Sequence, residues 1–437
     1  MKTKQILLIL LLFFSSINIY AQRDVEIKQI NDATYLFNKV KEICDKDNGD
    51  LWGSNIFCPA LLINGNSRFY VANDSLDVDN CVKEGMFFTG YLPNIYAIGN
   101  STLEVGSKNY ASIRYSEKHH FDTSLYLRTI IHEMFHVFMF ANNYDSISYD
   151  NPHMDTKIGR IYLKLELLAL KRALMNSGLK RKEAITDALC FRNMRQSHFP
   201  GAKENENNFE MQEGLPTYTE YALGIFSEKE RIATIMNGID NTMKEGSYIR
   251  SFGYDTGVSY AFLNDLSKDW KDTIFRVNDL SKVAMLVYDI NKDDIDTSNI
   301  ENYIEKYDYQ LIFITEDSLE NVREAFKLNI IDRLNTEALL IVDLDDNSFS
   351  MTSSMVRLNS SSTYFPNMNI SGKLGYINSK KDCVINWKED KAYFFLDEVV
   401  IENNKSNSEK IEIDINKGWN IIKEGRSYKL TETISDK

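Results

Sequence analysis

One short segment, IIHEMFHVF, restricts the fold of this chain more than any other. It places His132 and His136 four residues apart among residues that are almost all apolar. A helix that is apolar on nearly every side lies in the interior of its domain. Side chains four residues apart leave the same face of a helix. We therefore predict a buried helix, near residues 124–141, that presents two imidazole rings together.

The same segment predicts a metal site. Two imidazoles on one helical face can bind a single ion, and catalytic Zn²⁺ sites use histidine and carboxylate ligands. Glu133 would lie beside the ion, where a carboxylate can take a proton from a metal-activated water and pass it to the leaving amine. In a chain with six histidines, this pattern arises by chance on the order of once in a hundred sequences. The alternative, two histidines satisfied by packing, would leave Glu133 in apolar surroundings at a cost of about several kcal/mol.

A third protein ligand must come from elsewhere, because a catalytic zinc site takes three. No histidine follows His136 in VFMFANNYD, so the metzincin pattern is absent. Glu166 shares a helical face with three leucines of LKLELLALKRAL, and such a buried acid needs a partner, which can be an arginine instead of zinc. Glu183 points away from the apolar stripe of its helix. We favour Glu213 in MQEGLPTYTEYAL and keep the other two glutamates as alternatives.

Two segments of the chain resemble a known family. EGLPTYTEY is similar to the asparagine-glutamate-glycine helix of the aminopeptidase N family of gluzincins, zinc metallopeptidases in which that glutamate is the third ligand; the resemblance assigns this role to Glu213. GYDTGVSYAFLNDL resembles the tyrosine-x-x-glycine segment of the same enzymes. Its tyrosine stabilises the oxyanion, and the matching residue is Tyr254. Residues 50–226 also resemble a group of uncharacterised exported bacterial proteins with this zinc pattern.

The chain also departs from that family. His136 and Glu213 are separated by 76 residues, more than in the family. Pro216 predicts a helix that begins near Glu213, because proline is tolerated in the first helical turn. No segment resembles the glycine-alanine-methionine-glutamate-asparagine strand that binds a free amino terminus. The resemblance therefore implies a peptidase without implying aminopeptidase specificity.

Several nearby polar residues are further candidates. Thr217 and Glu220 follow Glu213 by four and seven residues, so they can share its helical face and orient the ligand. His153 and the pair His119 and His120 can bind substrate or a second metal, although a lone loop histidine more often does neither.

Length and periodicity predict an α+β protein of two or three domains. We expect a zincin-like, largely helical catalytic domain over 22–300 and a β-rich C-terminal domain over 301–437. Within the first domain, residues 22–120 are mixed α/β and residues 121–300 are helical. The expected helices lie near 33–44, 124–141, 158–177, 181–197 and 214–226. The expected strands include NIFCPALLING, SRFYVAN, NYASIRY, LIFIT, ALLIVDL, KAYFFLDEVVI and KIEIDI.

The amino terminus and the composition predict an exported chain. Residues 1–21 place Lys2 and Lys4 before an apolar run that is too short to span a bilayer, and they end on a small residue, as in a cleaved signal peptide. We expect a periplasmic or secreted protein without a membrane span. Loss of the two lysines changes the net charge from -13 to -15, which opposes binding to nucleic acid. The five cysteines are more typical of buried thiols than of a disulfide framework, although one bridge among the first three is an alternative.

Together these patterns predict a zinc-dependent peptidase with one Zn²⁺, acting on a peptide or protein substrate. Its metal ligands would be His132, His136 and Glu213, with Glu133 as general base and Tyr254 as the helper at the oxyanion. One alternative is a non-catalytic exported binding protein that keeps a zincin scaffold around a structural zinc ion. A second alternative is a zinc hydrolase that acts on a non-peptide amide or ester.

Overall fold

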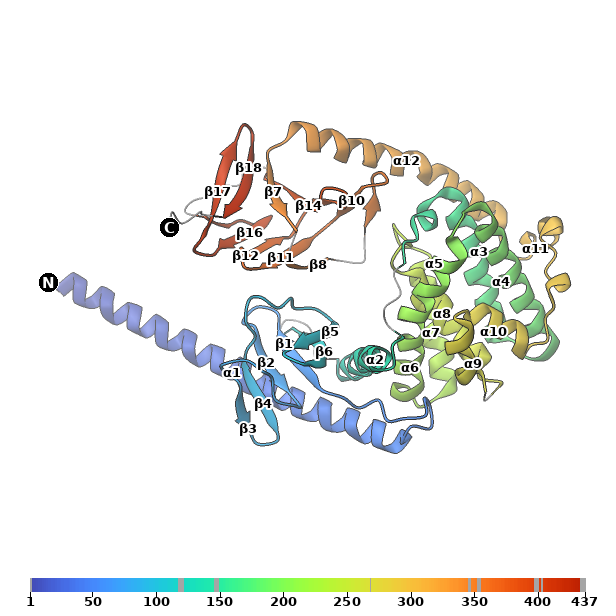
Figure 1. Cartoon of the computed structure of the whole chain (residues 1–437), viewed down its shortest axis with the longest axis horizontal. Coiled ribbons are helices and arrows are strands. Elements are labelled where there is room, and N and C mark those ends of the chain that lie inside the picture. The colour runs from blue at the N-terminus through green and yellow to red at the C-terminus, as the bar shows by residue number, and fades with distance from the viewer. Residues whose placement is uncertain are drawn as a thin grey trace. The chain divides into compact units, whose positions relative to one another are not determined.

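The computed structural model describes residues 2–116, 122–144, 149–267, 269–344, 347–351, 355–396, 401 and 404–432. The chain forms two compact units. The first contains Met1–Pro93, Ile98–Asn143 and Thr219–Gly224, and the second contains Asn94–Ala97, Tyr144–Tyr218 and Ile225–Lys437. Each unit combines helices with sheet (Figure 1), so the predicted α+β class agrees with the structure.

The first unit is built on a six-stranded sheet with the order β3-β4-β2-β1-β6-β5. The central strands β1 and β6 are parallel, and the other pairs are antiparallel. Helix α1 (Lys2–Asp47) packs against β2, and α2 (Thr123–Ala141) packs against β5 and β6. The segments predicted as strands in this region are confirmed. The strands are β1 (Ala60–Asn64), β2 (Phe69–Ala72), β3 (Val82–Glu84), β4 (Phe87–Tyr91), β5 (Ser101–Val105) and β6 (Lys108–Tyr115).

The helix predicted near 33–44 is the end of the longer α1. Residues 2–21 form its first part, and the predicted signal peptide stays a prediction. Among the helices of the described residues, none is both long enough and apolar enough to cross a bilayer. All five cysteines are free thiols, and Cys44, Cys190 and Cys383 are buried.

Helix α2 has well-defined ends. The side chain of Asp122 accepts a hydrogen bond from the Leu125 backbone N–H, which caps the start of the helix. The helix ends at Ala141, shortly before Asn143, which adopts a left-handed conformation with φ 60°. Its middle is buried, including His132 and Glu133, whereas Leu125 and Phe140 are exposed. The predicted buried helix is therefore confirmed over its central turns.

The second unit contains most of the helices. The antiparallel pair α3 and α4 packs together along its length, as expected from the predicted helices near 158–177 and 181–197. The helices are α3 (Lys157–Met175), α4 (Gly178–His198), α5 (Ala202–Phe209), α6 (Leu215–Gly224), α7 (Glu228–Thr242), α8 (Phe252–Asn264), α9 (Trp270–Val277), α10 (Leu280–Val287), α11 (Ile300–Ile304) and α12 (Tyr309–Thr336). Only the first part of α6 belongs to this unit, since Thr219–Gly224 belong to the first unit.

The helix that carries Glu213 does not begin near that residue, so this prediction was wrong. Helix α5 continues through a π-helical segment, Glu210–Gly214, directly into α6. The backbone N–H of Leu215 bonds to the carbonyl of Glu210, five residues earlier. This wider turn lies immediately before Pro216, which lacks an N–H donor and would clash with the preceding turn of a regular α-helix. The widened turn lets the helix continue through the proline.

The C-terminal part of the second unit is β-rich, as predicted, and its strands begin at Leu339. They form a seven-stranded sheet, β17-β18-β7-β14-β13-β10-β9, and a five-stranded sheet, β15-β16-β12-β11-β8. The strands are β7 (Leu339–Asp343), β8 (Ser348–Met351), β9 (Val356–Arg357), β10 (Ser362–Phe365), β11 (Met368–Gly372), β12 (Gly375–Ser379), β13 (Cys383–Asn386), β14 (Lys391–Phe395), β15 (Lys405–Asn407), β16 (Ile411–Ile415), β17 (Trp419–Glu424) and β18 (Ser427–Glu432).

One strand prediction in this part was wrong. The segment LIFIT lies in α12, a helix of 28 residues that leads from the helical part to the strands (Figure 1). No glycine or proline interrupts residues 309–336, and Glu316 ties the first half of the helix to α3 through Arg160 and Lys164. Near its end, Ile330 packs into the core of the seven-stranded sheet with Leu339. Tertiary contacts at both ends therefore outweigh the local β propensity.

Candidate metal centre

Two histidines of α2 and a glutamate of the π-helical segment form the candidate metal centre. One ligand atom of each of His132, His136 and Glu213 lies within 4.8 Å of the other two. Among the described residues, no other group of three or more His, Cys, Asp and Glu side chains meets this criterion. The structure thus brings together the three residues that the sequence singled out as ligands.

The two imidazole rings are arranged as ligands of one ion would be. The Nε2 atoms of His132 and His136 are 3.2 Å apart. Two nitrogens that each lie about 2.0–2.1 Å from a tetrahedral zinc ion are about 3.3 Å apart. The same distance suits a hydrogen bond in which one ring donates its proton to the other. Binding of a metal ion would replace that proton, so the geometry fits zinc.

The second nitrogen of His132 contacts a carboxylate. Its Nδ1 lies 3.2 Å from Oε2 of Glu220, and both side chains are largely buried. A metal-binding histidine usually donates its other ring N–H to a carboxylate, which holds the ring in place and leaves Nε2 for the metal. We expected Glu220 to orient Glu213. The structure instead places it on His132, from the next turns of the same helix.

Two contacts fix α6 against α2 next to this pair. The indole Nε1 of Trp52 donates to the hydroxyl of Thr219, at 3.0 Å, and Thr219 directly precedes Glu220. The Trp52 ring also packs on Phe135 of α2, with 4.9 Å between the centroids. No local sequence pattern predicts this role for Trp52, because Thr219 lies 167 positions later in the chain.

Glu133 lies in the buried middle of α2 and is 6 % exposed. It directly follows His132 in the sequence of this helix. Burying a carboxylate in apolar surroundings costs free energy unless a cation or a hydrogen-bond donor interacts with it. Its catalytic role stays a prediction.

The backbone around Glu213 is held by close packing on α8. A Cβ atom built on Gly214 would lie 2.6 Å from the Cα of Gly257, so the two backbones touch at this crossing. One turn earlier, Gly253 lies against the ring of Phe209. Thr217 donates its hydroxyl to the carbonyl oxygen of Glu213, at 2.7 Å. Thr217 therefore supports the backbone at Glu213, although we expected it to orient the side chain.

Tyr254 lies in the first turn of α8, the helix that packs on the π-helical segment. Its ring meets the ring of Phe209 edge-on, with 5.9 Å between the centroids. Phe209 directly precedes the segment that contains Glu213. The structure places Tyr254 on the helix next to the third ligand, and its role at the oxyanion stays a prediction.

The two alternative ligands lie elsewhere. Glu166 is fully buried, forms ion pairs with Arg192 at 3.1 Å and Arg195 at 2.7 Å, and accepts a hydrogen bond from Tyr260. Its partner is thus arginine, which was the alternative to zinc. Glu183 is half exposed and pairs with Lys306 and Arg172. Neither glutamate belongs to the metal group.

The other candidate histidines do not join the centre. His153 is buried, and its Nε2 lies 2.7 Å from Oε1 of Glu206, which also accepts a hydrogen bond from Arg195. This histidine therefore takes part in an interior ionic network. His119 and His120 lie outside the described residues.

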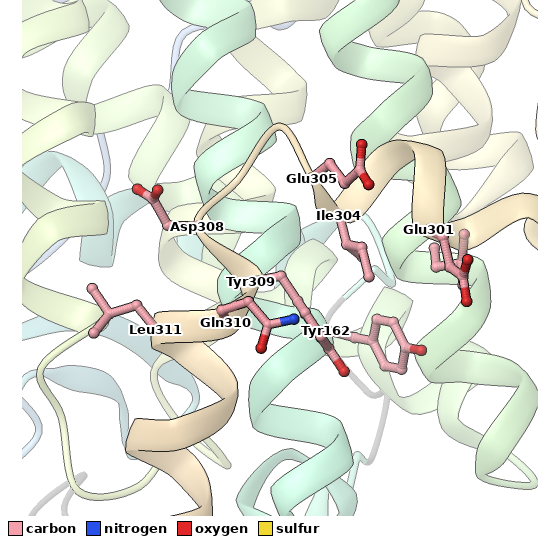
Figure 2. Close-up of a pocket in the computed structure, with 9 residues that line it drawn as sticks. Tyr162, Glu301, Ile304, Glu305, Asp308, Tyr309, Gln310 and Leu311 are labelled. Carbon is pink, nitrogen blue, oxygen red and sulfur yellow. The ribbon is translucent and has the colours of Figure 1, made fainter.

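One pocket of the second unit has no residue of the metal group in its lining (Figure 2). It has a volume of about 790 Å³ and is formed around the turn between α11 and α12. Tyr162 of α3 and Tyr309 lie next to each other there, and three carboxylates, those of Glu301, Glu305 and Asp308, line the pocket. It contains none of the predicted catalytic residues.

Comparison with known proteins adds no assignment. A scan against protein-family models, a search of curated proteins and a search of solved structures each found no match for this chain.

Proposed function

We propose that the protein is a zinc-dependent peptidase of the gluzincin type. The observation that carries the proposal is the convergence of His132, His136 and Glu213, with Glu220 on the second nitrogen of His132. Three ligand side chains with one position left open are typical of a catalytic zinc site, whereas a structural site has four protein ligands. Zinc, when bound, would supply a Lewis acid and lower the pKa of a coordinated water.

Protein side chains would provide proton transfer, stabilise the oxyanion and orient His132. Glu133, next to His132 on α2, would accept a proton from the attacking water and deliver it to the leaving nitrogen. Tyr254, on the helix that packs against the Glu213 segment, would donate a hydrogen bond to the oxygen that becomes negative in the transition state. Glu220 would hold the ring of His132 in one orientation.

The test of this function is the substitution Glu133→Gln. The variant should bind one zinc ion per chain, like the wild type, since Glu133 is not among the proposed ligands. Its hydrolysis of a mixture of quenched fluorescent peptides should fall by a factor of about 10²–10⁴, the usual contribution of a general base.

Metal content would be measured by mass spectrometry and hydrolysis by fluorescence. Glu409→Gln, at an exposed turn of the C-terminal part, makes the same chemical change and should alter neither quantity. Retained turnover in Glu133→Gln would remove the assigned role, and a wild-type protein that binds no zinc would remove the proposal as a whole.

A further inference from the structure

A second pocket, with a volume of about 330 Å³, lies between the helical part and the strands of the second unit. Tyr149, Asp150 and Arg250 line it from the helical part. Arg357, Phe365 and Trp387 line it from the C-terminal strands and turns. The pocket therefore gives the β-rich part a surface that can take part in substrate binding.

A ring contact within the second unit connects this pocket to the helix that leads into the Glu213 segment. The ring of Tyr149 stacks on the ring of Phe209, with 4.6 Å between centroids, and Phe209 lies four residues before Glu213. Burial raises the pKa of Tyr149 to about 12, and the nearby carboxylate of Glu213 adds to this increase. Tyr149 therefore belongs both to the pocket lining and to the aromatic packing around Phe209.

The charges that line the pocket favour an anionic ligand. Arg250 is exposed and forms no ion pair with another described residue. Arg357 pairs with Asp150 at 3.2 Å and donates to the carbonyl oxygen of Ser360. Two guanidinium groups thus face one carboxylate in a chain whose net charge is -13. The planar guanidinium group matches a carboxylate with two parallel hydrogen bonds.

Two aromatic rings of the C-terminal part also line the pocket. The indole N–H of Trp387 donates to the hydroxyl of Thr363, at 3.0 Å, which orients the ring. Phe365 meets Trp387 edge-on, with 6.4 Å between the centroids. An extended chain whose carboxylate contacts the arginines could pack its neighbouring apolar group on these rings.

We propose that this pocket binds a carboxylate of the substrate through the guanidinium groups of Arg250 and Arg357. The β-rich part, which provides Arg357, would thereby help to select the substrate. The inference deepens the proposed function and rests on it. The carboxylate can be the carboxyl terminus of a peptide or an acidic side chain. The two sources share the same chemistry and are separated by the experiment.

The experiment measures binding, so it does not depend on turnover. Zinc-loaded Glu133→Gln protein would be titrated into labelled, N-acetylated peptides of identical sequence, and Kd would be obtained from fluorescence anisotropy. One peptide has a free carboxyl terminus, a second is amidated, and a third is amidated but carries a glutamate side chain near the same end. At least one carboxylate peptide should bind about ten-fold more tightly than the amidated, uncharged one, as expected for one charge-assisted hydrogen-bonded contact.

Two substitutions in the pocket should act in opposite directions. Arg250→Gln should weaken binding of the preferred carboxylate peptide about ten-fold and leave the uncharged peptide unchanged. Asp150→Asn should tighten binding of the same peptide, because it releases Arg357 from its ion pair. Arg426→Gln, at an exposed turn of the C-terminal part, removes an equal charge and should have no effect.

The inference is overturned if the three peptides bind equally, if none binds, or if Arg250→Gln weakens all of them alike. These results are distinct from those that test the function. Carboxylate-selective binding without hydrolysis by the wild-type protein would remove the peptidase proposal and keep this site, and hydrolysis without carboxylate preference would do the reverse.

Discussion

Glu220 contacts one of the proposed metal ligands, His132, directly. Its carboxylate holds the Nδ1 of His132, and it lies seven residues after Glu213 on the same helix. One helix therefore provides both a ligand and the group that orients another ligand. A carboxylate in this position raises the basicity of the histidine and fixes its ring.

The substitution Glu220→Ala should therefore weaken zinc binding about 10- to 100-fold, the usual effect of losing a partner of a metal-bound histidine. Competition with a fluorescent chelator measures the change in Kd. Glu220→Gln retains an oxygen acceptor and should lose less affinity than Glu220→Ala. Equal zinc affinity in the wild type and Glu220→Ala would show that the contact with His132 does not support the metal.

Asp255 provides a prediction about pH. It is 9 % exposed, accepts a hydrogen bond from Thr242, and burial raises its pKa to about 7. The unfolded chain loses this proton near pH 4, whereas the folded chain keeps it to about pH 7. The contribution of this residue to the free energy of unfolding therefore falls as pH rises from about 4 to about 7, by an amount on the order of a few kcal/mol.

Asp255→Asn should remove this part of the pH dependence, because the amide cannot ionise. Urea unfolding at several pH values measures it. Asn is almost the same size as Asp, so the variant should keep the close fit against Gly238. An unchanged pH profile in Asp255→Asn would mean that the carboxyl group does not stay protonated in the folded protein.

At the level of elements, the crossing of α8 with the π-helical segment determines where Glu213 lies. The two helices approach so closely at Gly257 and Gly214 that a Cβ on either residue would meet backbone at 2.6 Å. Backbone cannot move aside as a flexible side chain can, so a larger residue there must separate the helices. The position of the third ligand, Glu213, thus depends on two glycines that are not themselves part of the metal group.

Gly257→Ala should lower the free energy of unfolding by about 1–3 kcal/mol, the usual cost of overpacking, and should also weaken zinc binding. Gly246→Ala is the matched control, because a Cβ there meets no atom within 4 Å, and its stability should change by no more than about 0.5 kcal/mol. Denaturant unfolding and metal titration measure both effects. Equal stability of the two variants would contradict the close contact.

At the scale of the second unit, Glu316 connects α12 to the other helices. It is fully buried, and its carboxylate contacts Arg160 and Lys164 of α3 and Arg323 of its own helix. Since α12 leads to the strands (Figure 1), this cluster joins the helical part to the part that contributes Arg357 and Trp387 to the carboxylate pocket.

Glu316→Gln should destabilise the protein by about 3–5 kcal/mol, because it leaves buried cations without their anionic partner. Amide exchange along α12 should increase in the same variant. Glu324→Gln, on α12 where the residue forms a solvent-exposed ion pair with Lys327, should change stability by less than about 1 kcal/mol, because exposed ion pairs contribute little. Similar exchange in the two variants would mean that Glu316 does not hold the helix in place.

Local spacing accounts for what could be predicted. The helix of His132 and His136, the strands β1, β2 and β6, and the need of the buried Glu166 for a partner follow from periodicity and from the cost of burying charge, which act within a few residues. The choice of arginine over zinc as that partner was left open. Glu213 was reached by a resemblance of short segments, and the structure brings it to the histidines. These features depend on the residues themselves.

Only the tertiary structure decided the rest. Local rules place the start of a helix near Glu213, whereas the structure continues α5 through a π-helical turn that packs on α8. They likewise predict a strand at LIFIT, whereas buried ion pairs with α3 hold this segment in a helix. The contact of Glu220 with His132 and the pocket of Arg250 and Arg357 join residues far apart in sequence. Such contacts depend on how the elements pack, which spacing along the chain does not determine.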